Sequence, residues 1–483
     1  MSMQNRSQVI QQIFGIQLLL MIFISLFSIY YFSFGFNPAS MTPLLCQVVT
    51  LLVFWNFWSW RKLSCQTFDL YSVFLMATAA FNCGQIFLQV LNLNPEGILM
   101  GKFSDQTIFE TILYVGLGLT SMHLGAILKM NSQREYIFQT EPLPSKELFD
   151  VGIFLVFISV IPTVLVMREL IQVVSASGYF GIYERQDQIG MNNLPVIISG
   201  LFAPGMVFLM ASWKLKPRML PWIDLAFIGQ GLLFTILGRR ADGASLLLIY
   251  AIARHTFVNP ISRKVVIVAS AVMIAVVFPL IGVVRNLDLN QRSDLGFMWD
   301  TFQSLDSPAV AALTEMGGSM QAISHTIDLL PKVRNYDLGA SYFYSALSIV
   351  PNFFWDLHPS VARGSPSVWL VKTVEPDIAA LGGGIGYSYI AETYLNFGWV
   401  GGPVVMLLLG YALAGLVAWS QLSGDPAKIA AALSFFTSAL SFARADSQSI
   451  IRPLIWYSLI PYLLVIILKK FREEDSALPR SLN

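Results

Sequence analysis

Long apolar runs separated by short polar stretches make up most of the chain. A helix that crosses a bilayer needs roughly twenty mostly apolar residues, and about twelve segments come close to this length. We predict membrane-spanning helices at Ile13–Phe32, Pro43–Trp60, Leu70–Leu91, Ile108–Leu128, Val151–Val174, Leu194–Trp213, Trp222–Leu237, Ala244–Phe257, Val265–Val284, Gly398–Trp419, Ile429–Ala443 and Pro453–Leu468. The eighth and eleventh segments are short, so a count of about eleven or about thirteen spans stays open.

The composition agrees with a membrane protein. The chain has 483 residues, of which 55% are hydrophobic and 12% are charged, whereas about a quarter of the residues in a soluble domain are charged. We therefore expect an all-α, polytopic integral membrane protein. The net charge of +1 gives no indication of a nucleic-acid partner. The sequence also lacks a phosphate-binding GxxxxGK(S/T) loop, an HExxH zinc motif and a DxD nucleotide-sugar motif.

The beginning of the chain indicates no cleaved signal and no disulfide framework. The first apolar run lacks a small-residue cleavage site and is followed by more spans, so we expect a retained anchor. Cys46, Cys65 and Cys83 lie in or beside early apolar segments. Their spacing matches neither a disulfide pattern nor a metal site, so we expect buried thiols.

The distribution of Lys and Arg among the loops predicts the orientation of the chain. With a cytoplasmic N-terminus, the basic residues Arg61, Lys129 and Lys214 fall on the inner side, and so does the tail with Lys469 and Lys470. This agrees with the excess of basic residues in cytoplasmic loops. We therefore predict that both termini are cytoplasmic.

Several arginines lie on the outer side of this arrangement, against the topological preference. They follow span seven in LGRRADGAS, end span nine, and follow span eleven in FARADSQSIIRP. These residues are Arg239, Arg240, Arg285, Arg444 and Arg452. Contacts with lipid phosphates are one explanation. A phosphate-bearing substrate explains them better, because arginine keeps its charge and can bind phosphate oxygens with two parallel hydrogen bonds.

The longest hydrophilic segment divides the chain into three parts. Residues 1–285 hold spans one to nine, residues 286–386 form a long outer loop, and residues 387–483 hold the last three spans and a cytoplasmic tail. The loop begins with helix-like apolar spacing, at Ala311, Leu313, Met316, Met320, Ile323, Ile327 and Leu330. We predict one or two amphipathic helices that lie on the membrane surface or wall a groove beside the bundle. The aromatic residues near Trp355 and Trp369 could stack on sugars or anchor the loop at the interface.

Two motifs carry a family resemblance: GRRADG at Gly238–Gly243 and GIGYSYIAETYLNFGWVGG at Gly384–Gly402. The second fits the pattern GxSxxAExYxNFGxxG, met here by Gly386, Ser388, Ala391, Glu392, Tyr394, Asn396, Phe397, Gly398 and Gly401. With the arginine that ends span nine, these motifs resemble the O-antigen polysaccharide polymerases (Wzy-type, oligosaccharide repeat-unit polymerases). The matching motifs cover only a small part of the chain, and the first four spans contribute none.

The resemblance implies a glycosyltransferase of the integral-membrane C type (GT-C-like), with a long periplasmic loop that bears amphipathic helices. Such an enzyme polymerises undecaprenyl-pyrophosphate-linked repeat units of O-antigen, capsule or exopolysaccharide at the periplasmic face of the inner membrane. Its partners would be the lipid-linked oligosaccharide, membrane lipid and a protein that regulates chain length. The resemblance implies no cofactor and no metal, since arginines can neutralise the leaving pyrophosphate.

Two other functions stay open at this point. One is an O-antigen ligase-type transferase, and the other is a transporter or flippase of lipid-linked glycans. A flippase would be expected to show a repeat between its halves, which the sequence does not show.

Transfer to a sugar hydroxyl needs one group that accepts a proton. Among Glu392, His358, His325, Glu315 and Asp242, we rank Glu392 first as the catalytic base and His358 second. The other reading of Glu392 is a packing residue paired with an arginine. The predicted substrate-binding residues are Arg239, Arg240, Asp242, Arg285, Arg363, Tyr394, Asn396, Arg444 and Arg452; Asp242 would orient the adjacent arginine pair.

Overall fold

The computed structural model describes most of the chain. The described residues are 3–64, 69–132, 145–177, 194–262, 295–303, 307–350, 352 and 354–477, with scattered positions between 264 and 282. All regular secondary structure within these ranges is helical. Arg285 and Cys65 lie outside them. Cys46 and Cys83 are buried free thiols.

Nine stretches of helix in the described part of the chain are long and apolar enough to cross a membrane. They belong to α1 (Met3–Phe34), α2 (Pro38–Ser64), α3 (Leu70–Val90), α4 (Asp105–Ser132), α5 (Lys146–Ser177), α7 with α8 (Leu194–Ser199 and Phe202–Ala211), α9 (Leu220–Ile236), α20 (Tyr389–Ser420), and α22 with α23 (Gln448–Pro453 and Ile460–Ala477). This confirms a polytopic, all-helical membrane protein.

The count of twelve spans is not established. The eighth and eleventh predicted spans correspond to α10 (Arg240–Phe257) and α21 (Pro426–Phe442), which do not meet the length and composition of a span. Polar residues at both ends of α10 shorten its apolar stretch. Most of the ninth predicted span, Val265–Val284, lies outside the described residues.

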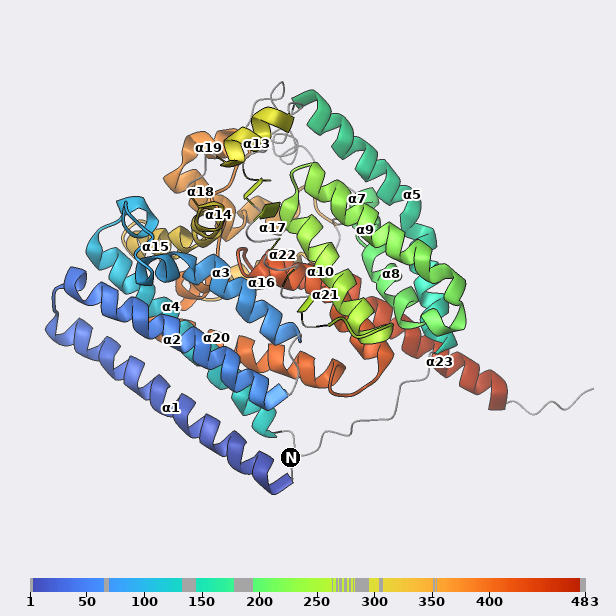
Figure 1. The fold of residues 1–483 in the computed structure, drawn as a ribbon, viewed down its shortest axis with the longest axis horizontal. Coiled ribbons are helices and arrows are strands. Elements are labelled where there is room, and N and C mark those ends of the chain that lie inside the picture. The colour runs from blue at the N-terminus through green and yellow to red at the C-terminus, as the bar shows by residue number, and fades with distance from the viewer. Residues whose placement is uncertain are drawn as a thin grey trace, which may run out of the picture.

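The helices form two groups joined by a central element (Figure 1). In the first group, α1 and α2 pack against α4, and α4 packs along α20. In the second, α5 packs against α7 and α8, and α9 packs against α10. Helix α21 lies between the groups and contacts α3, α20, α8 and α10. This arrangement makes α4 the most enclosed helix of the first group.

Small residues allow α4 and α20 to approach closely. A Cβ atom added to Gly410 would lie 1.8 Å from the carbonyl oxygen of Met122, and one added to Gly125 would lie 1.9 Å from that of Leu407. Only glycine fits at such a backbone contact, which is a common device between membrane helices.

Short helices of the outer loop gather at one end of the bundle, which we call the outer end (Figure 1). They are α14 (Pro308–Gly317), α15 (Met320–Leu329), α16 (Ala340–Leu347), α17 (Pro359–Arg363), α18 (Pro366–Val374) and α19 (Pro376–Ala380). Helix α14 packs on α3, and α15 packs on α4 and α20. The predicted apolar face is used in this packing, since Met320, Ile323 and Ile327 are buried.

The start of α20 differs from the prediction. The tenth span was expected to begin at Gly398, but the helix begins at Tyr389, with the Ser388 hydroxyl accepting a hydrogen bond from the N–H of Ile390 at 3.1 Å. Gly398 instead interrupts the helix, with φ 59° and ψ −150°, a conformation that glycine adopts more readily than other residues. The predicted glutamate segment is therefore the first part of α20.

Candidate active site

The Glu392 carboxylate is buried at the outer end of α20 and is 1% exposed. Its Oε1 accepts hydrogen bonds from the hydroxyls of Ser341 at 2.7 Å and Ser447 at 2.6 Å. Its Oε2 accepts one from the backbone N–H of Ser447 at 2.7 Å. Neutral donors thus satisfy the carboxylate, and none of the ion pairs among the described residues includes Glu392. The group joins α20 to α16 and to the turn before α22.

Asn396 lies one turn beyond Glu392 and completes the same cluster. Its Nδ2 donates to the Ser341 hydroxyl and to the Glu392 carbonyl oxygen, each at 2.8 Å. Its Oδ1 accepts from the N–H of Gly339 at 2.9 Å. The N–H of Leu338 donates to the Asn396 carbonyl oxygen at 3.1 Å. Asn396 therefore fixes the start of α16 against α20.

A second buried acid lies beside Ser447. The Oδ2 of Asp446 accepts hydrogen bonds from the hydroxyl of Ser367 at 2.8 Å and from its N–H at 3.3 Å. Ser367 belongs to α18 of the outer loop. The two consecutive residues Asp446 and Ser447 therefore fasten the turn after α21 to two different helices.

Two arginines of the outer loop share one carboxylate. Asp337 accepts from Arg334 at 2.6 Å and from Arg363 at 2.9 Å. The Arg334 guanidinium lies over the Trp369 ring, 4.6 Å from its centre, and the Arg363 guanidinium lies over Tyr344 at 4.8 Å. Each guanidinium carries five N–H donors, and both side chains are partly exposed. The pair has one surplus positive charge and donors that face away from Asp337.

Tyr387 is buried two residues before the start of α20. Burial raises the pKa of its hydroxyl well above the usual value, and the charges of Glu392 and Asp446 raise it further, whereas Arg334 lowers it. The hydroxyl is therefore protonated at neutral pH. The N–H of Asp337 donates to the Leu395 carbonyl oxygen at 2.9 Å, so the arginine pair lies beside the turn of α20 that carries Glu392 and Asn396.

Arg444 lies beside the motif segment Gly384–Gly402. Its carbonyl oxygen accepts a hydrogen bond from the N–H of Tyr387 at 3.2 Å. Its guanidinium lies over the Phe81 ring, 5.5 Å from the centre. Gly386 has a φ of 79°, and a Cβ atom there would lie 3.4 Å from Nη2 of Arg444. The glycine thus leaves room for this guanidinium beside the chain.

Arg239 lies at the junction of α9 and α10. Its Nε donates to Asp242 at 2.7 Å, and its guanidinium lies over Phe234, 5.0 Å from the ring centre. Asp242 thus pairs with the arginine that it was predicted to orient.

The structure describes different amounts of the other arginines that were predicted on the outer side. Arg452 lies in α22, and its Nη2 is buried without a hydrogen-bond partner among the described residues. Arg240 is the first residue of α10, and its side chain lies outside the described atoms, as does all of Arg285. The convergence of these arginines on one cavity stays a prediction.

His358 is 1% exposed and lies just before α17. Its Nδ1 accepts a hydrogen bond from the N–H of Ser360 at 3.2 Å and lies 2.7 Å from the Ser360 hydroxyl. Its Nε2 is buried and has no hydrogen-bond partner in the described part of the chain. The ring meets that of Trp355 edge to face, with centres 5.0 Å apart.

The other candidates take part in different contacts. Tyr394 is 3% exposed and packs edge to face against Tyr114 and Trp399, with ring centres 5.0 and 5.9 Å apart. His325 meets the Phe103 ring at 4.6 Å, and burial lowers its pKa. Glu315 is exposed on α14.

Sequence reasoning missed several residues of this site, among them Ser341, Ser447, Asp446, Arg334 and Asp337. Single serines carry no signal in a sequence, because most of them are solvated or bond to the local backbone. Arg334 and Asp337 lie in a non-helical stretch, where their spacing does not predict an ion pair, and nothing in the sequence indicates the third partner, Arg363.

The comparison with known families identifies the chain. The model of the O-antigen polysaccharide polymerase Wzy family matches residues 16–473, nearly the whole chain. No curated protein and no solved structure matches. Since the family model extends over the bundle, the outer loop and the candidate site, the chain belongs to the O-antigen polysaccharide polymerase Wzy family.

Proposed function

We propose that the chain polymerises undecaprenyl-pyrophosphate-linked oligosaccharide repeat units at the periplasmic face of the inner membrane. Membership of the family supports a polymerase that acts on lipid-linked oligosaccharides. The observation that carries the position of the reaction is the buried Glu392 cluster at the outer end. There, segments far apart in the sequence bring Ser341 and Ser447 to the Glu392 carboxylate, and the N–H of Asp337, the partner of Arg334, donates to the Leu395 carbonyl oxygen of α20.

The reaction needs one base and a leaving group. A hydroxyl oxygen of the incoming unit attacks the anomeric carbon of the growing glycan, and the bond from that carbon to the pyrophosphate oxygen breaks. The hydroxyl proton passes to the base, and the lipid pyrophosphate departs. Because arginines stabilise the departing pyrophosphate, no second carboxylic acid is needed, in contrast to glycoside hydrolysis.

Glu392 is the first candidate for the base. Both of its oxygens accept hydrogen bonds, so the proton would reach it through the Ser447 or Ser341 hydroxyl. Such a hydroxyl can release its own proton to the carboxylate while it takes one from the substrate. His358 is the second candidate. Because its Nδ1 accepts a hydrogen bond from the N–H of Ser360, the neutral ring carries its proton on the buried Nε2, so the substrate proton would reach Nδ1 through the Ser360 hydroxyl.

The arginines supply positive charge for the pyrophosphate groups. We assign this role to Arg239, Arg240, Arg285, Arg444 and Arg452, and we add Arg334 to the predicted Arg363. With these cations the transfer proceeds without a metal ion. Asp242 holds Arg239, while Tyr394 and Asn396 shape the wall of the site.

The tight contact of α4 with α20 favours a transferase over a flippase, since a flippase must open a path through its bundle. A ligase-type transferase would use the same centre and differ in its acceptor. We further propose that both termini are cytoplasmic and that a chain-length regulator binds the polymerase.

Proteoliposomes with the purified full-length protein and defined lipid-linked repeat units test this function. We expect a ladder of glycans on a gel, unaffected by EDTA. A single transfer to a different acceptor would instead indicate a ligase. Movement of the substrate across the bilayer without a new glycosidic bond would indicate a flippase.

A further inference from the structure

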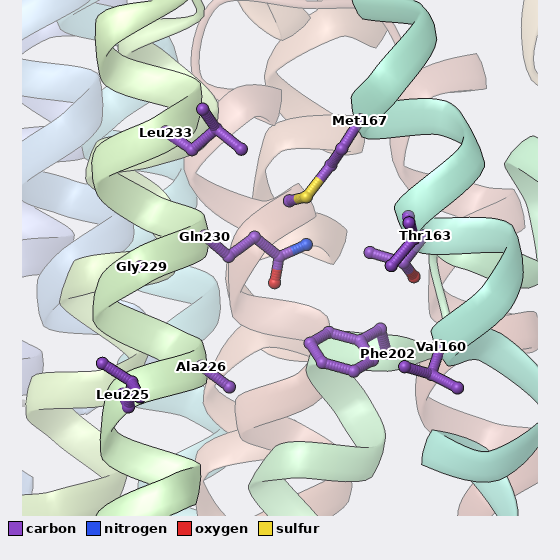
Figure 2. A pocket seen from close by; sticks show the side chains of 10 residues that line it. Val160, Thr163, Met167, Phe202, Leu225, Ala226, Gly229, Gln230 and Leu233 are labelled. Carbon is purple, nitrogen blue, oxygen red and sulfur yellow. The ribbon is translucent and has the colours of Figure 1, made fainter. Parts of the chain in front are cut away.

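A cavity of about 230 Å³ lies between two membrane helices, α5 and α9. Figure 2 shows Gln230 of α9 and Met167 of α5 reaching into it from opposite sides, with Phe202 of α8 below them. We call this space the α5–α9 groove. It lies apart from the Glu392 cluster, on different helices.

The groove exists because its two walls pack on other helices. Helix α5 packs on α7 and α8, and α9 packs on α10 and α8, so α5 and α9 make little direct contact. Small residues on α9, Ala226 and Gly229, widen the space between them. A Cβ atom added to Gly229 would meet no atom within 4 Å. The glycine therefore leaves open space that a ligand can fill.

The lining of the groove suits a hydrocarbon chain. Most of it is apolar, with Val160 and Leu233 on opposite walls. The Thr163 hydroxyl is bonded to its own helix, at the Ser159 carbonyl oxygen, 2.7 Å away. Gln230 adds one amide to an otherwise apolar surface. Since α5 and α9 are both candidate spans, the groove opens at the depth of lipid chains.

Positive charge lies at the outer end of the groove. Leu233 precedes the end of α9, where Arg239 lies over Phe234 and pairs with Asp242. Arg240 follows as the first residue of α10.

A second cation lies near the α7–α8 junction, next to the groove residue Phe202. The Tyr457 hydroxyl donates to the Ile197 carbonyl oxygen at 3.1 Å, and Arg452 precedes Tyr457 in the same continuous helical stretch, in α22. An amphiphile with a long apolar chain and an anionic head matches this combination of an apolar groove and outer cations.

We propose that the α5–α9 groove holds the polyprenyl chain of the lipid-linked substrate and directs its pyrophosphate toward Arg239 and Arg240. The proposal rests on the proposed function, because it requires a polyprenyl carrier. In this proposal the groove recognises the carrier lipid, and other residues bind the sugars.

Photo-crosslinking tests this site without any turnover. The probe is undecaprenyl pyrophosphate with a diazirine in an isoprene unit near its head, added to the full-length protein in nanodiscs. We expect labelled peptides from α5 and α9, and competition by unlabelled undecaprenyl pyrophosphate. Labelling competed equally well by phosphatidylglycerol would overturn the proposal, because the groove would then hold bulk lipid.

Gly229→Leu places its Cβ atom in open space and extends a side chain into the groove, and leucine is a better helix former than glycine. We expect about tenfold weaker labelling, the effect of losing the burial of roughly two methylene groups. Gly15→Leu is the matched control, because a Cβ atom at Gly15 also meets nothing within 4 Å. It should label as the wild type does.

The outcomes separate this proposal from the function itself. Wild-type labelling of Gly229→Leu, in a protein that still polymerises, would overturn the groove alone. Groove-specific labelling of a protein that joins no repeat units would support the groove as a polyprenyl site and overturn the polymerase assignment.

Discussion

Ser447 offers both its backbone N–H and its hydroxyl to the Glu392 carboxylate, at 2.7 and 2.6 Å. The pairing joins the turn after α21 to the first turn of α20. The same arrangement of donors allows an amide to replace the Glu392 carboxylate. A glutamine oxygen can accept from the N–H of Ser447, and its NH₂ can donate to the Ser341 and Ser447 hydroxyls, which also act as acceptors.

Glu392→Gln should therefore keep the fold and remove the base. We expect polymerisation to fall by about 10²–10⁴-fold, the usual contribution of general base catalysis. The measurement is the initial rate of ladder formation, with thermal unfolding as the check on folding. Ser341→Ala serves as the comparison, because it removes one donor and keeps the carboxylate. Wild-type rates from Glu392→Gln would assign Glu392 a purely structural role.

Arg334→Ala should weaken the use of lipid-linked substrate by about tenfold or more, since a charge-assisted hydrogen bond contributes about 1.5–3 kcal/mol. Lysine at this position should restore only part of the loss, because it lacks the planar fork that stacks on Trp369. The measurement is kcat/KM with a defined lipid-linked unit.

A nearby cation provides the control for this variant. Lys332 is exposed and pairs with Asp328 at 3.1 Å, so Lys332→Ala should leave kcat/KM unchanged. An equal loss in both variants would mean that the general charge of the loop matters, and not the Arg334–Asp337–Arg363 arrangement.

Apolar runs predicted the membrane helices well because a span has to be apolar over its whole length. The same criterion placed the start of α20 too late, at Gly398. Glu392 and Asn396 make the preceding turns too polar to be recognised as a span. Their polar groups are satisfied inside the protein by α16 and by the turn before α22, so lipid does not have to solvate them.

The site was predictable only where a motif marks it. Glu392 and Asn396 were found through the glycine-bounded motif, and Arg363 through the composition of the loop. The partners Ser341 and Ser447 come from segments distant in sequence, and only tertiary packing brings them together. The α5–α9 groove could not be predicted for the same reason, because it depends on how α5, α8 and α9 pack in the folded bundle.

Arg239→Ala should lower turnover by about tenfold or more if Arg239 binds pyrophosphate, because a charge-assisted hydrogen bond contributes about 1.5–3 kcal/mol. Arg239→Lys should recover only part of this, because it also loses its geometry toward Asp242. Arg61, exposed at the opposite end of the bundle, is the control, and Arg61→Ala should be fully active. Equal losses at both positions would argue against a pyrophosphate role for Arg239.

Gly410→Ala should destabilise the bundle, because its Cβ would lie 1.8 Å from the Met122 carbonyl oxygen. We expect a loss of about 1–3 kcal/mol, as for other overpacked sites, visible as a lower Tm in detergent. Gly415 on the same helix is the control. A Cβ there lies 3.4 Å from the flexible end of Lys129, so Gly415→Ala should unfold like the wild type. Equal Tm values for Gly410→Ala and the wild type would refute the close contact of α4 and α20.

His358→Asn separates the two nitrogens of the histidine ring. Asparagine is a good residue before a helix, so its Oδ1 can replace Nδ1 as acceptor for the N–H of Ser360, while Nε2 is lost. If Glu392 is the base, we expect this variant to fold and to keep substantial polymerisation, with at most a moderate rise in KM from the lost contact. The measurement is the pair of kcat and KM values beside those of Glu392→Gln. An inactive His358→Asn together with an active Glu392→Gln would transfer the role of base to the His358 ring.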